Sequence, residues 1–205
     1  MRRANRDRGR AVSAGRVAQI SVSPRGVPKT AVARARITCL GVDGDGHRPV
    51  PYHGGCARAV CVYALEAIRA LRADGHPIAP GTLGENVTVE GVPWDEVTPG
   101  RRLLLGDGVL LEITSFTTPC RTIMRAFSDG AYGRVGQAGH PGWSRVYARV
   151  LVEGLVAAGD PVRLLEWAAS TSPPGARMFD APPRQSRRAV RCSEPGPTAG
   201  GAGTG

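Results

Sequence analysis

Short stretches in which apolar and polar residues alternate recur along the chain and predict many short β-strands. The stretch 31–39 shows the alternation most clearly, as expected for a strand with one face packed on a core. Two apolar stretches flank Gly106-Asp107-Gly108, a turn sequence typical of a β-hairpin. The predicted strands are 17–22, 31–39, 86–89, 103–105, 109–115, 144–152 and 162–165.

Only one segment, 57–73, has the periodicity of an amphipathic helix. Its apolar residues recur every 3.6 positions and its charged residues take the other side. Gly75 and Pro77 end it. The predicted fold class is therefore mainly β with some α, a closed or nearly closed β-barrel with one main helix. The apolar positions are Val60, Ala64, Ala67, Ile68 and Leu71.

Composition divides the 205 residues into a folded unit and two tails. Residues 1–16 and 168–205 are poor in large apolar side chains and rich in Arg, Gly, Pro, Ser and Ala. Such segments cannot bury enough surface to offset their ordering entropy. We expect a disordered basic arm at 1–16, one folded domain at 17–167 and a disordered tail at 168–205. No apolar run approaches the roughly 20 residues of a membrane span.

The net charge of +10 invites a nucleic-acid interpretation, but its distribution weakens it. Residues 1–16 contribute +5 and residues 168–205 contribute +3, so the predicted domain carries only +2. Specific nucleic-acid binding through the basic tails is therefore the weakest of the functions considered. The five cysteines form no regular framework, and their odd number favours reduced thiols in a cytoplasm.

Cys120 is the thiol best placed for chemistry. It follows a predicted strand, with Pro119 before it and Arg121 after it. Proline fixes the backbone, and a neighbouring guanidinium favours the thiolate that attacks substrates or binds metals. The alternative is that Cys120 is a small buried apolar residue.

A second cluster, His47, His53, Cys56 and Cys61, contains the ligand types that zinc prefers. Its spacing is wrong for a zinc knuckle, so a turn at His53-Gly54-Gly55 and core packing of Cys61 are the favoured explanation, with structural zinc as the weaker alternative. The glycines at 54 and 55 permit close approach of a ligand to the backbone. An anionic group could then meet free N–H donors at the helix start, with Arg58 beside them.

Carboxylates in the loop Asp43-Gly44-Asp45 could bind Mg²⁺ or Ca²⁺, but the EF-hand pattern is absent. The chain also has no nucleotide-binding P-loop and no serine nucleophile elbow. Nucleotide hydrolysis and serine-dependent acyl transfer therefore have little support.

In order along the chain, these elements resemble the MOSC family, named for the C-terminal domain of molybdenum cofactor sulfurase. The resemblance covers about 17–166 and is closest to the stand-alone bacterial members. Each motif is weak by itself, and the ordered set is specific. The matching pieces are Gly26-Val27-Pro28-Lys29, 41–47, His53-Gly54-Gly55 with Arg58, the Gly81–Asn86 loop, Gly106-Asp107, Pro119-Cys120, and 142–151 followed by Gly159-Asp160.

The resemblance implies a barrel of the pyruvate-kinase type that binds the molybdenum cofactor (molybdopterin), with Cys120 as the metal ligand. A soft thiolate suits such a centre. Cations and free N–H groups would bind the cofactor's phosphate, and polar side chains would contact the pterin. The predicted cofactor-binding residues are Lys29, Asp45, His47, His53, Gly54, Gly55, Arg58, Glu85, Asn86, Thr118 and Arg121.

Family members of this type reduce N-hydroxylated compounds, so the resemblance implies a molybdenum-dependent oxidoreductase acting on a small N-hydroxylated substrate. Electrons would come from a separate flavin or iron–sulfur protein, because no motif for such a group is present. The alternative is a sulfur- or cofactor-carrier module with a persulfide on Cys120. The three-helix extension of some bacterial members is not visible, and the Gly- and Pro-rich tail does not fit it.

Overall fold

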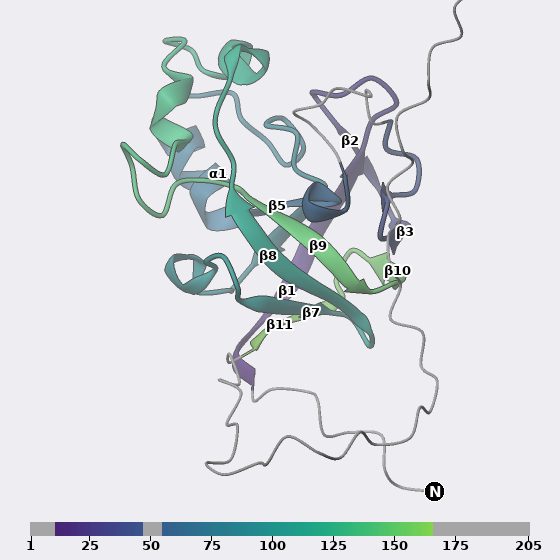
Figure 1. The fold of residues 1–205 in the computed structure, drawn as a ribbon. Helices are drawn as coiled ribbons and strands as arrows, with labels where there is room; N and C mark the ends of the chain where they lie inside the picture. The colour runs from purple at the N-terminus through teal and green to yellow at the C-terminus, as the bar shows by residue number, and fades with distance from the viewer. Residues whose placement is uncertain (1–10, 47–54, 166–205) are drawn as a thin grey trace, which may run out of the picture.

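The computed structural model describes residues 11–46 and 55–165, which form a mainly β domain (Figure 1). Its one α-helix among these residues is α1 (Leu65–Ala73). The 3-10 helices are η1 (Cys56–Arg58), η2 (Trp94–Glu96), η3 (Arg121–Ala126) and η4 (Tyr132–Val135). The strands are β1 (Ala11–Val22), β2 (Thr30–Val32), β3 (Arg34–Thr38), β4 (Gly41–Val42), β5 (Val60–Ala64), β6 (Val87–Glu90), β7 (Arg102–Leu105), β8 (Val109–Phe116), β9 (Val146–Val152), β10 (Gly154–Ala157) and β11 (Pro161–Leu165).

A closed β-barrel of seven strands forms the centre of the domain. The sheet runs β11-β7-β8-β9-β5-β6-β1, and β1 then pairs with β11, so the two edges meet. All of these pairings are antiparallel except β5 with β6. Closure removes the exposed edges that would otherwise pair with other chains. The predicted barrel is confirmed.

The long strand β1 makes this closure possible. Its first half pairs with β11, from Ala11 opposite Leu165 to Arg16 opposite Pro161. Its second half pairs with β6, from Arg16 to Ile20. The prediction that residues 1–16 form a disordered arm is therefore wrong for 11–16, because backbone pairing orders a segment whose side chains are small or polar. Residues 1–10 and 166–205 lie outside the described residues.

The predicted helix at 57–73 is also wrong in its first half. Val60–Ala64 is strand β5, and only Leu65–Ala73 is helical. All five side chains of β5 are buried, because the strand lies between β6 and β9 and is covered on both faces. A continuously apolar strand of this kind resembles a buried helix in sequence.

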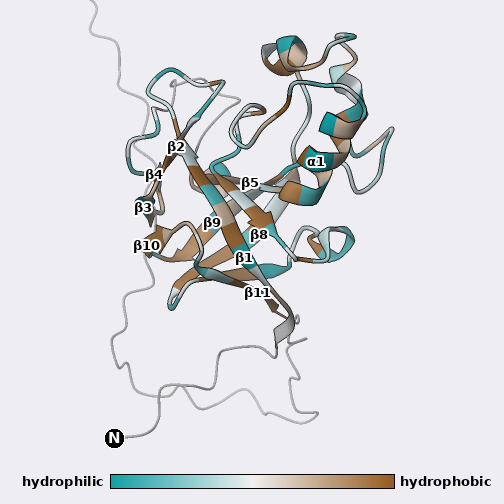
Figure 2. Cartoon of the chain, turned by 180° about the vertical axis from the view of Figure 1, so that it is seen from behind, coloured by the Kyte–Doolittle hydropathy of each residue, from teal (hydrophilic) through white to brown (hydrophobic). Residues whose placement is uncertain are grey.

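Two apolar clusters stabilise the domain. The larger fills the barrel with Val, Ile and Leu side chains from the strands, among them Ile20, Val62 and Leu111. The smaller packs α1 against η3 and η4, through Ile68, Leu71 and others. Figure 2 shows the hydrophobic residues concentrated on the barrel strands.

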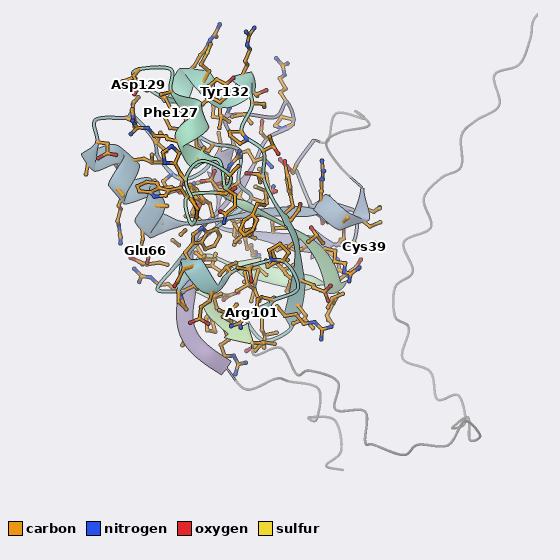
Figure 3. The ribbon with its side chains drawn as sticks, turned by 60° about the vertical axis from the view of Figure 1, so that its left-hand side comes forward. Cys39, Glu66, Arg101, Phe127, Asp129 and Tyr132 are labelled. Atoms are coloured by element: carbon orange, nitrogen blue, oxygen red, sulfur yellow. The ribbon has the colours of Figure 1, made fainter. Side chains whose placement is uncertain are left out.

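The segment 121–142 contains η3 and η4 and packs beside α1. The rings of Phe127 and His76 meet edge to face with 5.2 Å between their centroids. Ser128 Oγ donates a hydrogen bond to the Gly75 carbonyl oxygen at 2.8 Å. Figure 3 shows Phe127 on the side of the molecule that carries α1, and Cys39 on the opposite side.

A smaller sheet of order β10-β3-β4 adjoins the barrel. The predicted strand at 31–39 is divided between this sheet and β2, which pairs with β1. The sequence pattern missed β10. Among the described residues, no helix is long and apolar enough to cross a membrane.

Because β1 closes the barrel, removing residues 2–16 should destabilise the protein far more than removing residues 2–10. Only the longer deletion removes most of the β1–β11 pairs. At about 1 kcal/mol per net hydrogen bond, we expect a loss of at least about 2 kcal/mol. That loss corresponds to a Tm lower by about 4–8 °C, measurable by circular dichroism. Equal Tm values for the two deletions would contradict the assigned closure.

Candidate functional site

Cys120 lies beyond the end of β8 and immediately before η3. Its thiol is half-buried and free of any disulfide. The Cys120 carbonyl oxygen accepts a hydrogen bond from the Ile123 N–H at 3.2 Å, which fixes the residue at the first turn of η3. Thr117, three residues before Cys120, is buried, and its N–H donates to the Arg145 carbonyl oxygen at 2.9 Å. The backbone on both sides of the thiol is therefore held in place.

Tyr147, on β9, is a half-buried residue of the barrel wall whose hydroxyl senses the charge of Cys120. The guanidinium of Arg58 lies over its ring, with the Arg58 Cζ 5.4 Å from the ring centroid. Burial raises the pKa of the Tyr147 hydroxyl, and negative charge on Cys61 and Cys120 adds to the shift, while Arg145 and Arg58 oppose it. Arg58 thus lies over a phenol that the sequence analysis did not single out, and the charge of Cys120 acts on the same phenol.

Three other predicted residues form one buried hydrogen-bonded network. Lys29 Nζ lies 2.5 Å from Asp45 Oδ2, and the exposed fractions of the two side chains are 9% and 2%. Asn86 Nδ2 donates to the same oxygen at 2.8 Å. Asp45 Oδ1 accepts from the Ser23 N–H at 2.9 Å. The Asp45 carboxylate therefore connects the loop after β1, the loop after β4 and the start of β6.

The network continues into the barrel wall, since Asn86 Oδ1 accepts the Cys61 N–H at 3.1 Å. Its composition changes two predictions. Lys29 already neutralises Asp45, so Lys29 positions the loop instead of offering a free cation to a phosphate. The same contact leaves Asp45 poorly suited to Mg²⁺ or Ca²⁺.

Glu85 was predicted to contact the cofactor, but the structure places it out of reach of a ligand, with an exposed fraction of 0%. Its Oε1 accepts the Gly81 N–H at 2.7 Å and the Thr88 hydroxyl at 3.4 Å. Among the described residues, Oε2 has no hydrogen-bond partner. Glu85 therefore shapes the loop Gly81–Asn86 from within.

Arg145 is the functional candidate that the sequence analysis missed. It is buried, with an exposed fraction of 6%, and its Nη1 donates to the Leu83 carbonyl oxygen. Its Nε has no hydrogen-bond partner among the described residues. Its charge acts on Cys61, Glu85 and Tyr147. The pattern of apolar and polar positions in the sequence does not distinguish a buried arginine next to a strand from an exposed one, so it gives no signal for Arg145.

The segment that carries Arg145 is fixed by two aromatic side chains, the buried Tyr63 and the half-buried Trp94. Tyr63 Oη donates to the Trp143 carbonyl oxygen at 2.9 Å, and Trp94 Nε1 donates to the Ser144 carbonyl oxygen at 3.0 Å. Gly84 has φ +89°, and a Cβ there would lie 2.7 Å from Val27 Cγ2. Gly84 therefore lets two loops approach each other. One contains Leu83, whose carbonyl oxygen accepts the Arg145 hydrogen bond, and the other contains Val27.

The remaining predicted residues are only partly placed. His47, His53 and Gly54 lie outside the described residues. Gly55 is exposed and precedes η1 with φ +81°. Thr118 and Arg121 are exposed on either side of Cys120.

The zinc alternative gains no support from the described residues. In that part of the chain, no group of three or more His, Cys, Asp or Glu side chains could hold a metal ion. Burial also raises the pKa of the Cys61 thiol, which disfavours the thiolate that zinc requires.

The donor set around Cys120 fits a cofactor that combines a soft metal with anionic oxygens. An accessible thiol can supply a soft ligand, and the unpartnered Arg145 Nε is a buried donor in need of an acceptor. Arg58 adds a second cation, over the ring of Tyr147. Arg145 lies two residues before Tyr147 in the chain, and its carbonyl oxygen accepts the N–H of Thr117, three residues before Cys120.

The buried Glu85 makes stability depend on pH. Burial raises the pKa of its carboxyl above the ordinary value of 4.5. The folded state therefore holds the proton more tightly than the unfolded state, and stability falls as pH rises above about 4.5. In Glu85→Gln, the amide oxygen keeps the Gly81 bond and no charge is buried. We expect the Tm advantage of Glu85→Gln over the wild type to grow as pH rises above about 4.5, and a difference that does not change with pH would contradict this account.

Comparisons with known proteins agree with this geometry. The chain is 32% identical over 124 residues to the uncharacterized protein YflK of Bacillus subtilis, covering 60% of this chain and 55% of that protein. It is 34% identical over 134 residues to a protein of Gibberella moniliformis described as a reductase, covering 63% of this chain and 23% of that one. The chain thus spans only about half, or less, of these two relatives.

The fold has a counterpart in the crystal structure of YiiM from Geobacillus stearothermophilus. The TM-score is 0.60 at 24% identity, covering 76% of this chain and 77% of that one. The family model described as the MOSC domain matches residues 49–163, more than half of the chain. With the barrel and the Pro119-Cys120 motif in place, this match shows that the chain belongs to the MOSC domain family.

Proposed function

We propose that this protein is a molybdenum-cofactor-dependent reductase of small N-hydroxylated compounds, with Cys120 as the metal ligand. The observation that carries the proposal is the half-buried Cys120 thiol just beyond β8, whose charge acts on the Tyr147 phenol, with the Arg58 guanidinium over the Tyr147 ring and the charge of Arg145 acting on the same phenol. The family relationship supports a function related to the molybdenum cofactor. The description of the Gibberella relative as a reductase favours reduction over transport.

Each residue has a definite part in binding this cofactor. The Cys120 sulfur holds the metal, while Arg145 Nε and the Arg58 guanidinium bind anionic oxygens. The network of Lys29, Asp45 and Asn86 holds the surrounding loops in register. When bound, the cofactor supplies two-electron redox chemistry that the side chains lack.

The reaction converts R–NH–OH, two electrons and two protons into R–NH₂ and water. Tyr147 is placed to assist with the protons. Because burial raises the pKa of its hydroxyl above the usual value of 10.0, Tyr147 Oη keeps its proton at neutral pH. A protonated phenol can donate a hydrogen bond to the departing oxygen and bias its loss as water. We place the protein in the cytoplasm, with a separate flavin or iron–sulfur protein as electron donor.

The role of Cys120 can be tested by substituting it with alanine. We expect Cys120→Ala to lose at least about 100-fold in the anaerobic reduction of benzamidoxime by reduced methyl viologen, since loss of an outer-shell partner alone costs 10–100-fold. Bound molybdenum, measured by mass spectrometry of the metal, should fall in parallel.

Cys39→Ser is the matched control. Cys39 is a second half-buried cysteine, in the turn between β3 and β4, and serine keeps its size and its ability to donate a hydrogen bond, so the substitution should leave activity and metal content unchanged. If Cys120→Ala retains wild-type turnover, the proposal fails. The carrier function replaces the reductase function if two results are found together: the wild-type protein shows no turnover, and a cysteine desulfurase adds one sulfur atom to Cys120.

A further inference from the structure

A cleft of about 670 Å³ opens along the outer side of η3, next to the candidate site. This volume is within the range of about 300–1,000 Å³ that holds small molecules. One wall is η3 itself, and the other is formed by Val27 and Pro28, with Pro77 and Thr82 completing the lining. Much of the surface is apolar, which suits the hydrocarbon or ring portion of a ligand.

Both walls of the cleft continue directly into the candidate site. Arg121, which lines the cleft, follows Cys120 in the chain, and Ile123 in the same wall donates its N–H to the Cys120 carbonyl oxygen. On the other side, Pro28 precedes Lys29 of the buried network. A molecule that lies in the cleft therefore has one end close to the Cys120 segment.

The charges of the cleft have a single sign. Arg121 and Arg125 line it and are exposed, and no acidic residue is among its lining residues. Neither arginine forms an ion pair with an acidic residue in the part of the chain that the structure describes, whereas Arg69, Arg101 and Arg134 all do. Two unpaired guanidiniums beside an apolar surface favour an oxyanion over a neutral or cationic group.

We propose that this cleft binds the substrate and selects N-hydroxylated compounds that carry a carboxylate or phosphate away from the N–O group. The apolar wall holds the body of the substrate, and Arg121 and Arg125 bind its oxyanion. Arg121, predicted to bind the cofactor's phosphate, here faces the substrate instead. The inference depends on the proposed reductase function for the N–O group, but the oxyanion preference can be measured without turnover.

The test compares benzamidoxime with 4-carboxybenzamidoxime, which differ only in the carboxylate. Isothermal titration of the purified protein at low ionic strength should give about tenfold tighter binding of the carboxylated probe, the size expected for charge-assisted hydrogen bonds. The advantage should shrink as salt is added, because exposed charges are screened, while binding of benzamidoxime stays constant.

Arg125→Gln should reduce the tenfold advantage to about twofold, because it removes one of the two cations. Arg72→Gln, on the exposed face of α1 and outside the cleft, is the matched control for loss of one positive charge and should keep the advantage. Equal affinity for the two probes, or the same advantage in both variants, overturns the inference.

Turnover separates this inference from the proposed function. If benzamidoxime is reduced and no carboxylate preference appears in kcat/KM, the reductase function stands and the assignment of the cleft is wrong. If the carboxylated probe binds through Arg125 but neither compound is reduced at full molybdenum content, the reductase function fails, and with it the substrate class proposed for the cleft.

Discussion

The Asp45 carboxylate is the contact on which the geometry of the site depends. It accepts hydrogen bonds from the Ser23 N–H and from Asn86 and pairs with Lys29, so one buried side chain holds three loops together. Removing one partner of a buried pair typically costs about 3–5 kcal/mol, because the other charge is left without compensation. The barrel strands can keep their register without this carboxylate, but the loops above them would lose their common anchor.

Strands of the barrel can be predicted from the sequence where only one of their faces is buried. Strands buried on both faces cannot be recognised in this way. Alternation in β9 and the Gly106-Asp107-Gly108 turn between β7 and β8 follow directly from local patterns. The β5 strand is covered on both sides, so its apolar run carries no period of two and was assigned to the helix. The first residues of β1 pair with β11, which is far away in the sequence, and no local pattern in 11–16 indicates that pairing.

The candidate site can be predicted from sequence only in part, for a similar reason. A motif identifies residue types and order, so Cys120, Asp45 and Asn86 stand out as candidates, but it does not reveal which charges neutralise each other in space. Lys29 therefore seemed available to a phosphate, although Asp45 occupies it. Arg145 and Tyr147 are ordinary members of the segment that leads into β9. Their importance arises only when β9 packs beside the thiol and the Gly84 loop closes over Arg145.

The position of each arginine relative to solvent decides how long a ligand stays bound to it. Arg145 is buried, so its attraction for an anion is weakly screened and suits a cofactor that must remain in place through many turnovers. Arg121 and Arg125 are exposed, and salt and water weaken their hold on a carboxylate. A substrate must leave as product after each cycle, which a permanent buried ion pair would prevent. The buried Arg145 and the exposed Arg121 and Arg125 thus match the different residence times that the proposed cofactor and the proposed substrate require.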